Sequence, residues 1–162
     1  MGNFLRSAAV VIIIVSTVVL QVLLTRYFPR LLLDLPLVAV LYLTMAKESL
    51  LWTILSGTVV GFLQDSLSPG PLGLNGFTKI AIGCLAYMTN TIIAVDRIAT
   101  RWGLLFVSSV LAALLFVLLR VLFLNRNESM DGERILLSGL INACAGLPLF
   151  YIFDKISQPA NE

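Results

Sequence analysis

Residues 102–124 read WGLLFVSSVLAALLFVLLRVLFL and are almost entirely apolar. Arg120 is its only charged side chain, and no proline interrupts it. A helix crosses the hydrocarbon core of a bilayer, about 30 Å thick, with roughly 20 apolar residues. Backbone groups cannot stay unpaired in lipid, and the apolar run is continuous where a barrel strand would alternate. The stretch therefore predicts a membrane-spanning helix.

The rest of the chain has the same character. Hydrophobic residues make up 59% of the 162 residues and charged residues 12%, with a mean hydropathy of +0.97. Average soluble domains carry about a quarter charged residues, so this much apolar surface needs lipid. The sequence predicts an all-α integral membrane protein with a single transmembrane domain over residues 1–162. We expect a bundle of about six transmembrane helices, at residues 8–27, 31–46, 49–67, 77–95, 102–124 and 135–156.

Charged and reactive side chains disfavour several classes of function. The net charge is only +2 and no run of Lys or Arg is present, so nucleic acid is not an expected partner. The chain has no His, and Cys84 and Cys144 lie in apolar segments without a C-x-x-C spacing. We therefore expect buried, inert thiols, no metal, no cofactor and no enzymatic activity.

Residues 68–76, SPGPLGLNG, contain two prolines and three glycines in nine positions. This composition predicts a structured loop between two helices. Gln64, Asp65, Asn75 and Lys79 lie on either side of it, and ionisable groups near membrane depth are costly enough to indicate a role. If the two helices are antiparallel neighbours, Asp65 and Lys79 form an ion pair across the loop. The alternative is that both side chains extend separately to the lipid headgroups.

Two stripes of small residues suggest close helix packing. Gly57 and Gly61 form a G-x-x-x-G pattern, and Gly139, Ala143 and Gly146 form a similar stripe near the carboxyl terminus. Small residues on one face let a second helix approach closely. That second helix belongs either to this chain or to a partner subunit, and the sequence leaves both possibilities open.

Residues 61–79, GFLQDSLSPGPLGLNGFTK, resemble the signature region of the rod shape-determining protein MreD family. In that family G-x-x-x-D and then P-L-G-x-N-G-x-x-K join two membrane helices. Chain length, helix number and a short second helix also resemble the family across essentially the whole sequence. We assign a structural polar cluster to this signature loop, with the members Gln64, Asp65, Pro71, Gly73, Asn75, Gly76 and Lys79.

The resemblance implies a multi-pass protein of the bacterial inner membrane with both termini in the cytoplasm, an orientation that the Lys and Arg counts do not decide. It implies a non-catalytic scaffold subunit of the cell-elongation complex, which helps to organise peptidoglycan synthesis and rod shape. The implied partners are the membrane helix of MreC, then MreB and the peptidoglycan polymerase and transpeptidase in the wider complex. Self-association is a further expectation.

The architecture of the family suggests an alternative function. The family is similar to the substrate-binding subunits of energy-coupling-factor vitamin transporters, which bind small molecules. Such a carrier lines its cavity with polar or aromatic side chains from several helices. The middle positions of the predicted helices are overwhelmingly Leu, Val, Ile and Ala, a composition that suits helix-to-helix contact and favours the scaffold.

Overall fold

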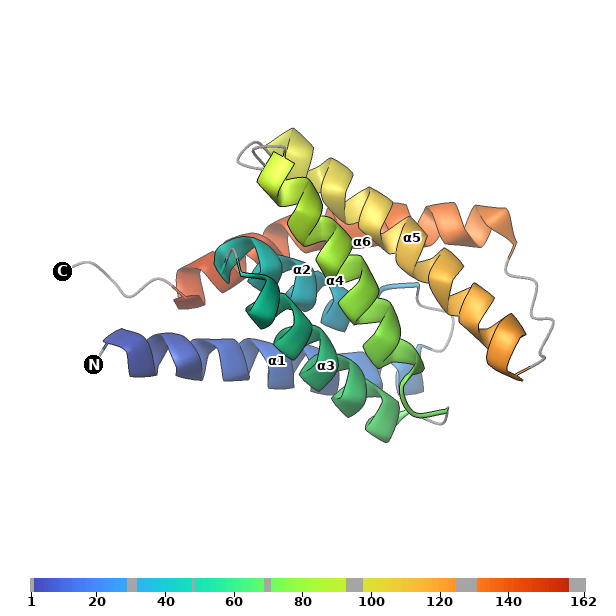
Figure 1. Cartoon of the computed structure of the whole chain (residues 1–162), viewed down its shortest axis with the longest axis horizontal. Coiled ribbons are helices and arrows are strands. Elements are labelled where there is room, and N and C mark those ends of the chain that lie inside the picture. Colours follow the sequence, from blue (N-terminus) through green and yellow to red (C-terminus); the bar gives the residue numbers. More distant parts are fainter. Residues whose placement is uncertain are drawn as a thin grey trace.

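The computed structural model describes residues 2–28, 32–47, 49–68, 71–92, 98–124 and 131–157, with backbone only for residues 2–10, 47, 124, 156 and 157. Six helices follow one another along the chain, and these described residues contain no strand. The helices are α1 (Gly2–Tyr27), α2 (Leu35–Lys47), α3 (Leu50–Leu67), α4 (Leu74–Ile92), α5 (Ile98–Leu124) and α6 (Gly132–Ser157). The all-α, six-helix architecture expected from the sequence is confirmed (Figure 1).

Several helix boundaries differ from the prediction. The helices α1, α5 and α6 begin earlier than expected, at Gly2, Ile98 and Gly132, and the starts of α2 and α4 are set by aspartates that cap them. α2 begins at Leu35 and not at residue 31, since Oδ1 of Asp34 accepts the backbone N–H of Leu37 at 3.1 Å. α4 begins at Leu74 and not at residue 77, because Asp65 accepts hydrogen bonds from its first turn. Residue 31 and residues 93–95, which were predicted to be helical, lie outside the described part of the chain.

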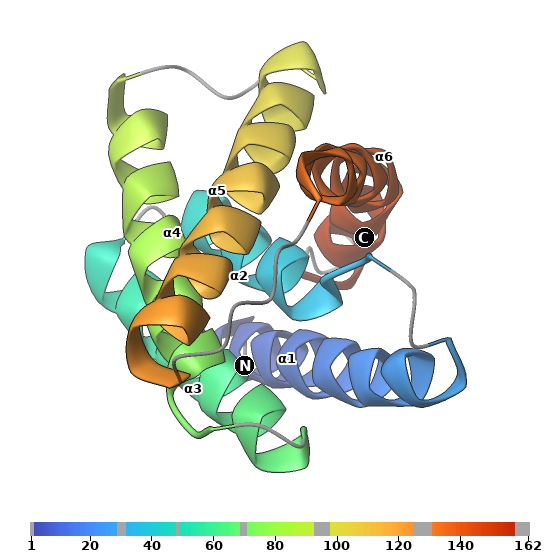
Figure 2. The ribbon, with the colours of Figure 1, turned by 90° about the vertical axis from the view of Figure 1, so that its right-hand side faces the viewer.

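Helix α2 lies at the centre of the bundle. Figure 2 shows it among the other helices. It contacts each of the other five helices, and residues 35–44 are all buried. Its 13 residues measure about 20 Å, so it is shorter than the roughly 30 Å hydrocarbon core. Because protein surrounds it on all sides, α2 carries apolar residues around its whole circumference.

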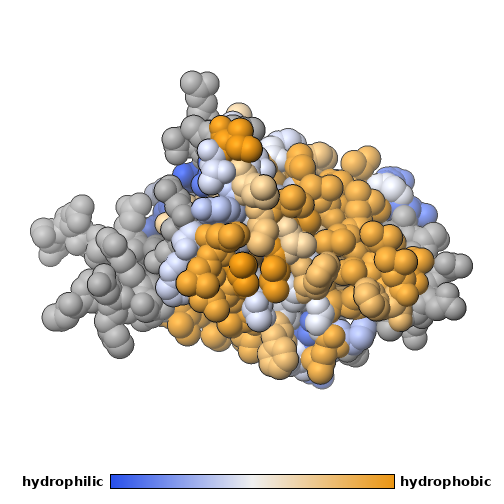
Figure 3. Space-filling view, in the orientation of Figure 1, coloured by the Kyte–Doolittle hydropathy of each residue, from blue (hydrophilic) through white to orange (hydrophobic). Residues whose placement is uncertain are grey.

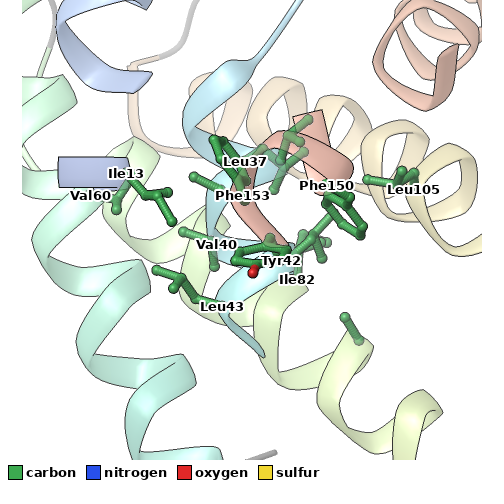
Figure 4. Close-up of a cluster of buried hydrophobic side chains, with 14 of the residues drawn as sticks. Ile13, Leu37, Val40, Tyr42, Leu43, Val60, Ile82, Leu105, Phe150 and Phe153 are labelled. Atoms are coloured by element: carbon green, nitrogen blue, oxygen red, sulfur yellow. The ribbon is translucent and has the colours of Figure 1, made fainter. Parts of the chain in front are cut away.

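The core forms where α2 meets its neighbours (Figure 4). The ring of Tyr42 lies 5.4 Å from that of Phe150 and 5.2 Å from that of Phe153, so α2 and α6 are joined by aromatic contacts. The helices α1, α3, α4 and α5 also contribute to this cluster, with the buried residues Ile13, Val60, Ile82 and Leu105, respectively. The buried residues Leu37, Val40 and Leu43 of α2 belong to the same cluster.

The outer surface is apolar. Among the described residues, α3, α5 and α6 are long and apolar enough to cross a bilayer by length and composition. Large hydrophobic side chains on these helices are exposed, including Leu51, Phe62, Leu122 and Leu136. Hydrophobic residues cover the middle of the face in Figure 3, with hydrophilic residues toward its edges. Such a surface is stable in lipid and not in water.

Successive helices run in opposite directions, so α1 begins and α6 ends at the same end of the molecule (Figure 1). We call this the terminal end. The opposite end, called the distal end below, holds the carboxyl ends of α1, α3 and α5 and the amino ends of α2, α4 and α6. The signature loop therefore lies at the distal end.

Candidate functional site

Asp65 organises the signature loop. Its side chain is buried, with 4% of the residue exposed, at the last turn of α3. Its carboxylate accepts the backbone N–H groups of Gly73 at 2.8 Å, Asn75 at 3.3 Å and Gly76 at 3.4 Å, and the side-chain amide of Asn75 at 2.7 Å. A negative charge at a helix amino terminus is stabilised by unpaired N–H groups and by the helix dipole. Asp65 therefore fixes the start of α4 against the end of α3.

The backbone of the loop explains one of its glycines. Gly73 has a φ of +100°, in the region that residues with a side chain rarely adopt. This conformation accompanies the hydrogen bond from its N–H to Oδ2 of Asp65. Pro71 is exposed beside it, and residues 69 and 70 of the signature lie outside the described part of the chain.

Lys79 does not pair with Asp65, and the ion pair predicted across the loop is wrong. Nζ of Lys79 lies 3.3 Å from Oδ2 of Asp34, at the start of the central helix. Lys79 is 1% exposed, and the side chain of Asp34 is 31% exposed. The carboxylate of Asp65 is directed instead at the N–H groups of α4, so a different acid neutralises the buried lysine.

Residues 32–34 connect α1 to α2 outside both helices, although the carbonyl of Asp34 accepts the N–H of Val38 at 3.2 Å. Side chains from neighbouring helices supply partners: Gln21 donates to the carbonyl of Leu33 at 2.9 Å and accepts the N–H of Leu35 at 3.0 Å. Asn142 accepts the N–H of Asp34 at 2.8 Å, and Ser138 donates to the carbonyl of Leu32 at 3.0 Å. Backbone polar groups at membrane depth need such partners.

Sequence reasoning missed these supporting residues. Gln21 and Asn142 are polar positions inside otherwise apolar helices, and Ser138 lies one turn before Asn142. That pattern was the available signal, because an uncompensated amide in a membrane helix is costly. Their common target could not be read from the sequence, because Asn142 and Ser138 lie 108 and 106 residues away from the groups that they bind.

The Gly57 and Gly61 stripe packs inside the chain. A Cβ atom added to Gly61 would overlap the backbone of Gly76, and one added to Gly57 would lie 3.1 Å from the backbone of Ile80. Both glycines are buried, so α4 occupies the face that the sequence left open to a partner helix.

The stripe on α6 is also covered from within. A Cβ on Gly139 would meet Val110 at 2.7 Å, and one on Gly146 would meet Leu105 at 2.7 Å, both on α5. Ala143 between them is fully buried. The two stripes therefore join α3 to α4 and α5 to α6, and neither is available to another protein.

A cavity of about 440 Å³ opens at the distal end, beneath the signature loop. Its lining includes polar side chains from α1, α3, α4, α5 and α6, together with Asp34 just before α2, although the apolar composition of the helices had argued against such a cavity. The cavity forms because the central helix stops short of the distal end, and single polar residues of the surrounding helices line the space that it leaves. Polar members of the lining are Gln21, Thr25, Asp34, Gln64, Asp65, Ser68, Asn75, Thr78, Ser109, Arg120, Ser138 and Asn142.

A second hollow of about 400 Å³ lies between α4 and α5, toward the terminal end. Its lining is mostly apolar and includes the small residues Ala86, Ala99 and Gly103. A Cβ atom on Gly103 would meet nothing within 4 Å, so this glycine leaves open space between the two helices.

The cysteines do not match the expectation of buried thiols. Both are free; Cys84 is half-buried, and Cys144 is exposed on the apolar outer surface. Over the described ranges, no three His, Cys, Asp or Glu side chains come together to hold a metal ion.

These features define a helical membrane protein whose signature loop and central helix are tied together by buried polar contacts. The family model for rod shape-determining protein MreD matches residues 3–156. The chain belongs to the MreD family, as the signature region suggested, and is therefore a rod shape-determining membrane protein. Comparison with curated proteins gave no match, and comparison with solved structures gave none either.

Proposed function

We propose that the chain is a non-catalytic scaffold subunit of the bacterial cell-elongation complex. In this role it binds the membrane helix of MreC and brings it together with MreB and the peptidoglycan polymerase and transpeptidase. The observation that carries the proposal is the match to the MreD family over residues 3–156. The apolar outer surface supports it, because such a surface offers helix-to-helix contact within the bilayer.

We propose the inner membrane as the location, with the terminal end in the cytoplasm and the signature loop at the periplasmic side. Single cysteines test this orientation in a chain whose two native cysteines are replaced by serine. Ser68→Cys and Asp131→Cys lie at the distal end, and Ala99→Cys lies near the terminal end. A membrane-impermeant maleimide added to intact spheroplasts should label the first two and spare Ala99→Cys until the membrane is opened. The reverse pattern would invert the proposed topology.

The partner helix needs a face that this chain does not already occupy. Since both small-residue stripes are buried, we propose that MreC docks in the hollow between α4 and α5. The lining of this hollow includes the small residues Ala86, Ala99 and Gly103. Small residues allow two helices to approach closely in lipid.

Co-purification in mild detergent tests this proposal. Gly103→Leu should reduce the capture of MreC at least about tenfold, equivalent to roughly 1.4 kcal/mol, by filling the hollow. The thermal unfolding midpoint of the variant should stay near that of the parent, because a Cβ atom there meets no other atom within 4 Å and the rest of the side chain enters the open hollow.

Cys144→Leu is the matched control, because it adds bulk to an exposed position on α6. It should capture MreC normally and support rod shape. If Gly103→Leu also captured MreC at the parental level, the docking site would lie elsewhere. If the parent protein captured no MreC at all, the scaffold function itself would be wrong.

One observation favours the rival function of a vitamin-binding subunit similar to those of energy-coupling-factor transporters. The distal cavity is large enough for a small molecule and carries polar side chains. A panel of water-soluble vitamins tests this reading: a carrier should be stabilised by one of them against thermal unfolding. The scaffold predicts capture of MreC without stabilisation by any vitamin.

A further inference from the structure

Two polar atoms at the distal cavity have no hydrogen-bond partner in the structure. They are Oγ of Ser109 on α5 and the side-chain oxygen of Gln64 on α3. Both residues line the cavity, and Ser109 is only 2% exposed. The hydroxyl groups of serine and threonine in membrane helices usually donate to a carbonyl of the preceding turn, as those of Thr17 and Thr58 do here. A buried polar atom that lacks a partner is costly, so something that the chain itself does not supply is expected to satisfy it.

We infer that the distal cavity is a binding site for an uncharged ligand that carries hydroxyl or amide groups. An amide oxygen only accepts hydrogen bonds, so the ligand must present a donor to Gln64. A hydroxyl group satisfies Gln64 and can either accept from or donate to Ser109. The volume of about 440 Å³ lies within the usual range for small-molecule sites, roughly 300–1,000 Å³.

The charges around the cavity argue against an ionic ligand. Asp34 is paired with Lys79, and Asp65 is held by the N–H groups at the start of α4. Arg120 also lines the cavity and lies 5.7 Å from the ring of Phe116. The formal charges of Asp34, Asp65, Lys79 and Arg120 sum to zero, so neither an anion nor a cation would be favoured by the local field.

The wall formed by α5 is apolar on one side. Ala112, Ala113 and Phe116 line it between Ser109 and Arg120 along the helix. A sugar ring has this combination of hydroxyl edges and an apolar face, and an aromatic side chain contacts such a face well. The same chemistry could come from two sources: a free sugar-like solute, or the uncharged headgroup of a glycolipid in the surrounding bilayer.

Purified protein in nanodiscs distinguishes these sources. The discs contain phosphatidylcholine alone, phosphatidylcholine with monoglucosyl diacylglycerol, or phosphatidylcholine with phosphatidylglycerol, and free glucose is added to a fourth sample. We expect the glycolipid to raise the unfolding midpoint by roughly 5 °C at saturation and to appear as a bound species in native mass spectra. A similar rise with glucose would identify the free solute as sufficient, which also supports the site. Stabilisation by phosphatidylglycerol alone, or by none of the probes, would overturn the inference, the latter leaving the cavity to water.

Variants locate the site. Ala113→Phe fills the cavity and should abolish the shift, while Leu118→Phe places the same aromatic side chain at an exposed position on the same helix and should leave the shift unchanged. Ser109→Ala removes the unpartnered hydroxyl, so it should raise the basal midpoint and reduce the shift. Retention of the full shift in Ala113→Phe would mean that the lipid binds elsewhere on the surface, contrary to the inference. The capture of MreC is measured separately, so the ligand site and the scaffold function can fail independently.

Discussion

Nζ of Lys79 on α4 lies 3.3 Å from Oδ2 of Asp34, which caps the central helix from a position 45 residues earlier in the chain. The contact joins the helix that follows the signature loop to the helix at the centre of the bundle. Asp34 therefore has two tasks: one carboxylate oxygen accepts the N–H of Leu37, and the other balances the buried lysine. The pair couples the position of the signature loop to that of α2.

A double-mutant cycle should detect this coupling. Lys79→Met leaves the carboxylate of Asp34 without its cation, and we expect a loss of about 3 kcal/mol, at the lower end for a buried pair because Asp34 is partly exposed. Asp34→Asn combined with Lys79→Met should lose less than the sum of the single changes, with a coupling free energy of about 2 kcal/mol. Unfolding of the purified protein in detergent measures each term.

The control cycle combines Asp65→Asn with Lys79→Met. These side chains have different partners, so their effects should add to within about 0.5 kcal/mol. Strong coupling in the control, with none between Asp34 and Lys79, would restore the pairing expected from the sequence.

Asp65 should matter through its charge as well as its shape. Asp65→Asn keeps the size of the side chain but presents one acceptor oxygen to the four donors that now share two. Hydrogen bonds to a charged group contribute more than neutral ones, so we expect a loss of about 2 kcal/mol and a drop of roughly 4–8 °C in the unfolding midpoint. Ser66→Ala removes an exposed hydroxyl on the same turn and should have little effect.

The contact between Gly61 and Gly76 should be asymmetric. Gly61→Ala forces a methyl group into the backbone of Gly76, so we expect a loss of about 3 kcal/mol and reduced accumulation in membranes. Gly76→Ala points its methyl group where the nearest atoms are 3.9 Å away, and it should be tolerated or slightly stabilising. Comparing the yields and unfolding midpoints of the two variants tests this difference, and equal damage from both would contradict the packing described here.

Gln21 should stabilise the connection between α1 and α2. Gln21→Leu leaves the carbonyl of Leu33 and the N–H of Leu35 without these partners, and we expect a loss of about 2 kcal/mol. Hydrogen exchange should increase at residues 32–37 before it increases elsewhere in α2. Ser16→Ala on α1 is the control, because the exposed hydroxyl of Ser16 donates to the carbonyl of Ile13 in its own helix and does not contact Gln21.

The sequence was sufficient to predict the six helices, since their apolar runs are long and the segments between them contain proline, glycine or charged residues. It also located the loop around Asp65 and the family signature. It could not identify the partner of Lys79, because Asp34 approaches it only when α2 occupies the centre of the bundle. The glycine stripes were found by spacing, but spacing does not say which helix covers them; the structure assigns both to helices of the same chain.

The distal cavity was missed for a related reason. Its polar lining is contributed a few residues at a time by α1, α3, α4, α5, α6 and the connections between helices, and no single segment has a polar pattern strong enough to indicate it. Composition averaged over a helix favoured apolar contact, whereas the cavity forms because the central helix is short.

The shortness of α2 has an electrical consequence. The insulating path along its axis is about 20 Å, roughly two-thirds of the surrounding hydrocarbon thickness, and the polar cavity begins where the helix ends. A transmembrane voltage therefore falls more steeply along this axis than through the lipid beside it. Asp34 and Lys79 lie at the edge of that steep drop, where displacement of one elementary charge across the full potential is worth about 2.3 kcal/mol per 100 mV.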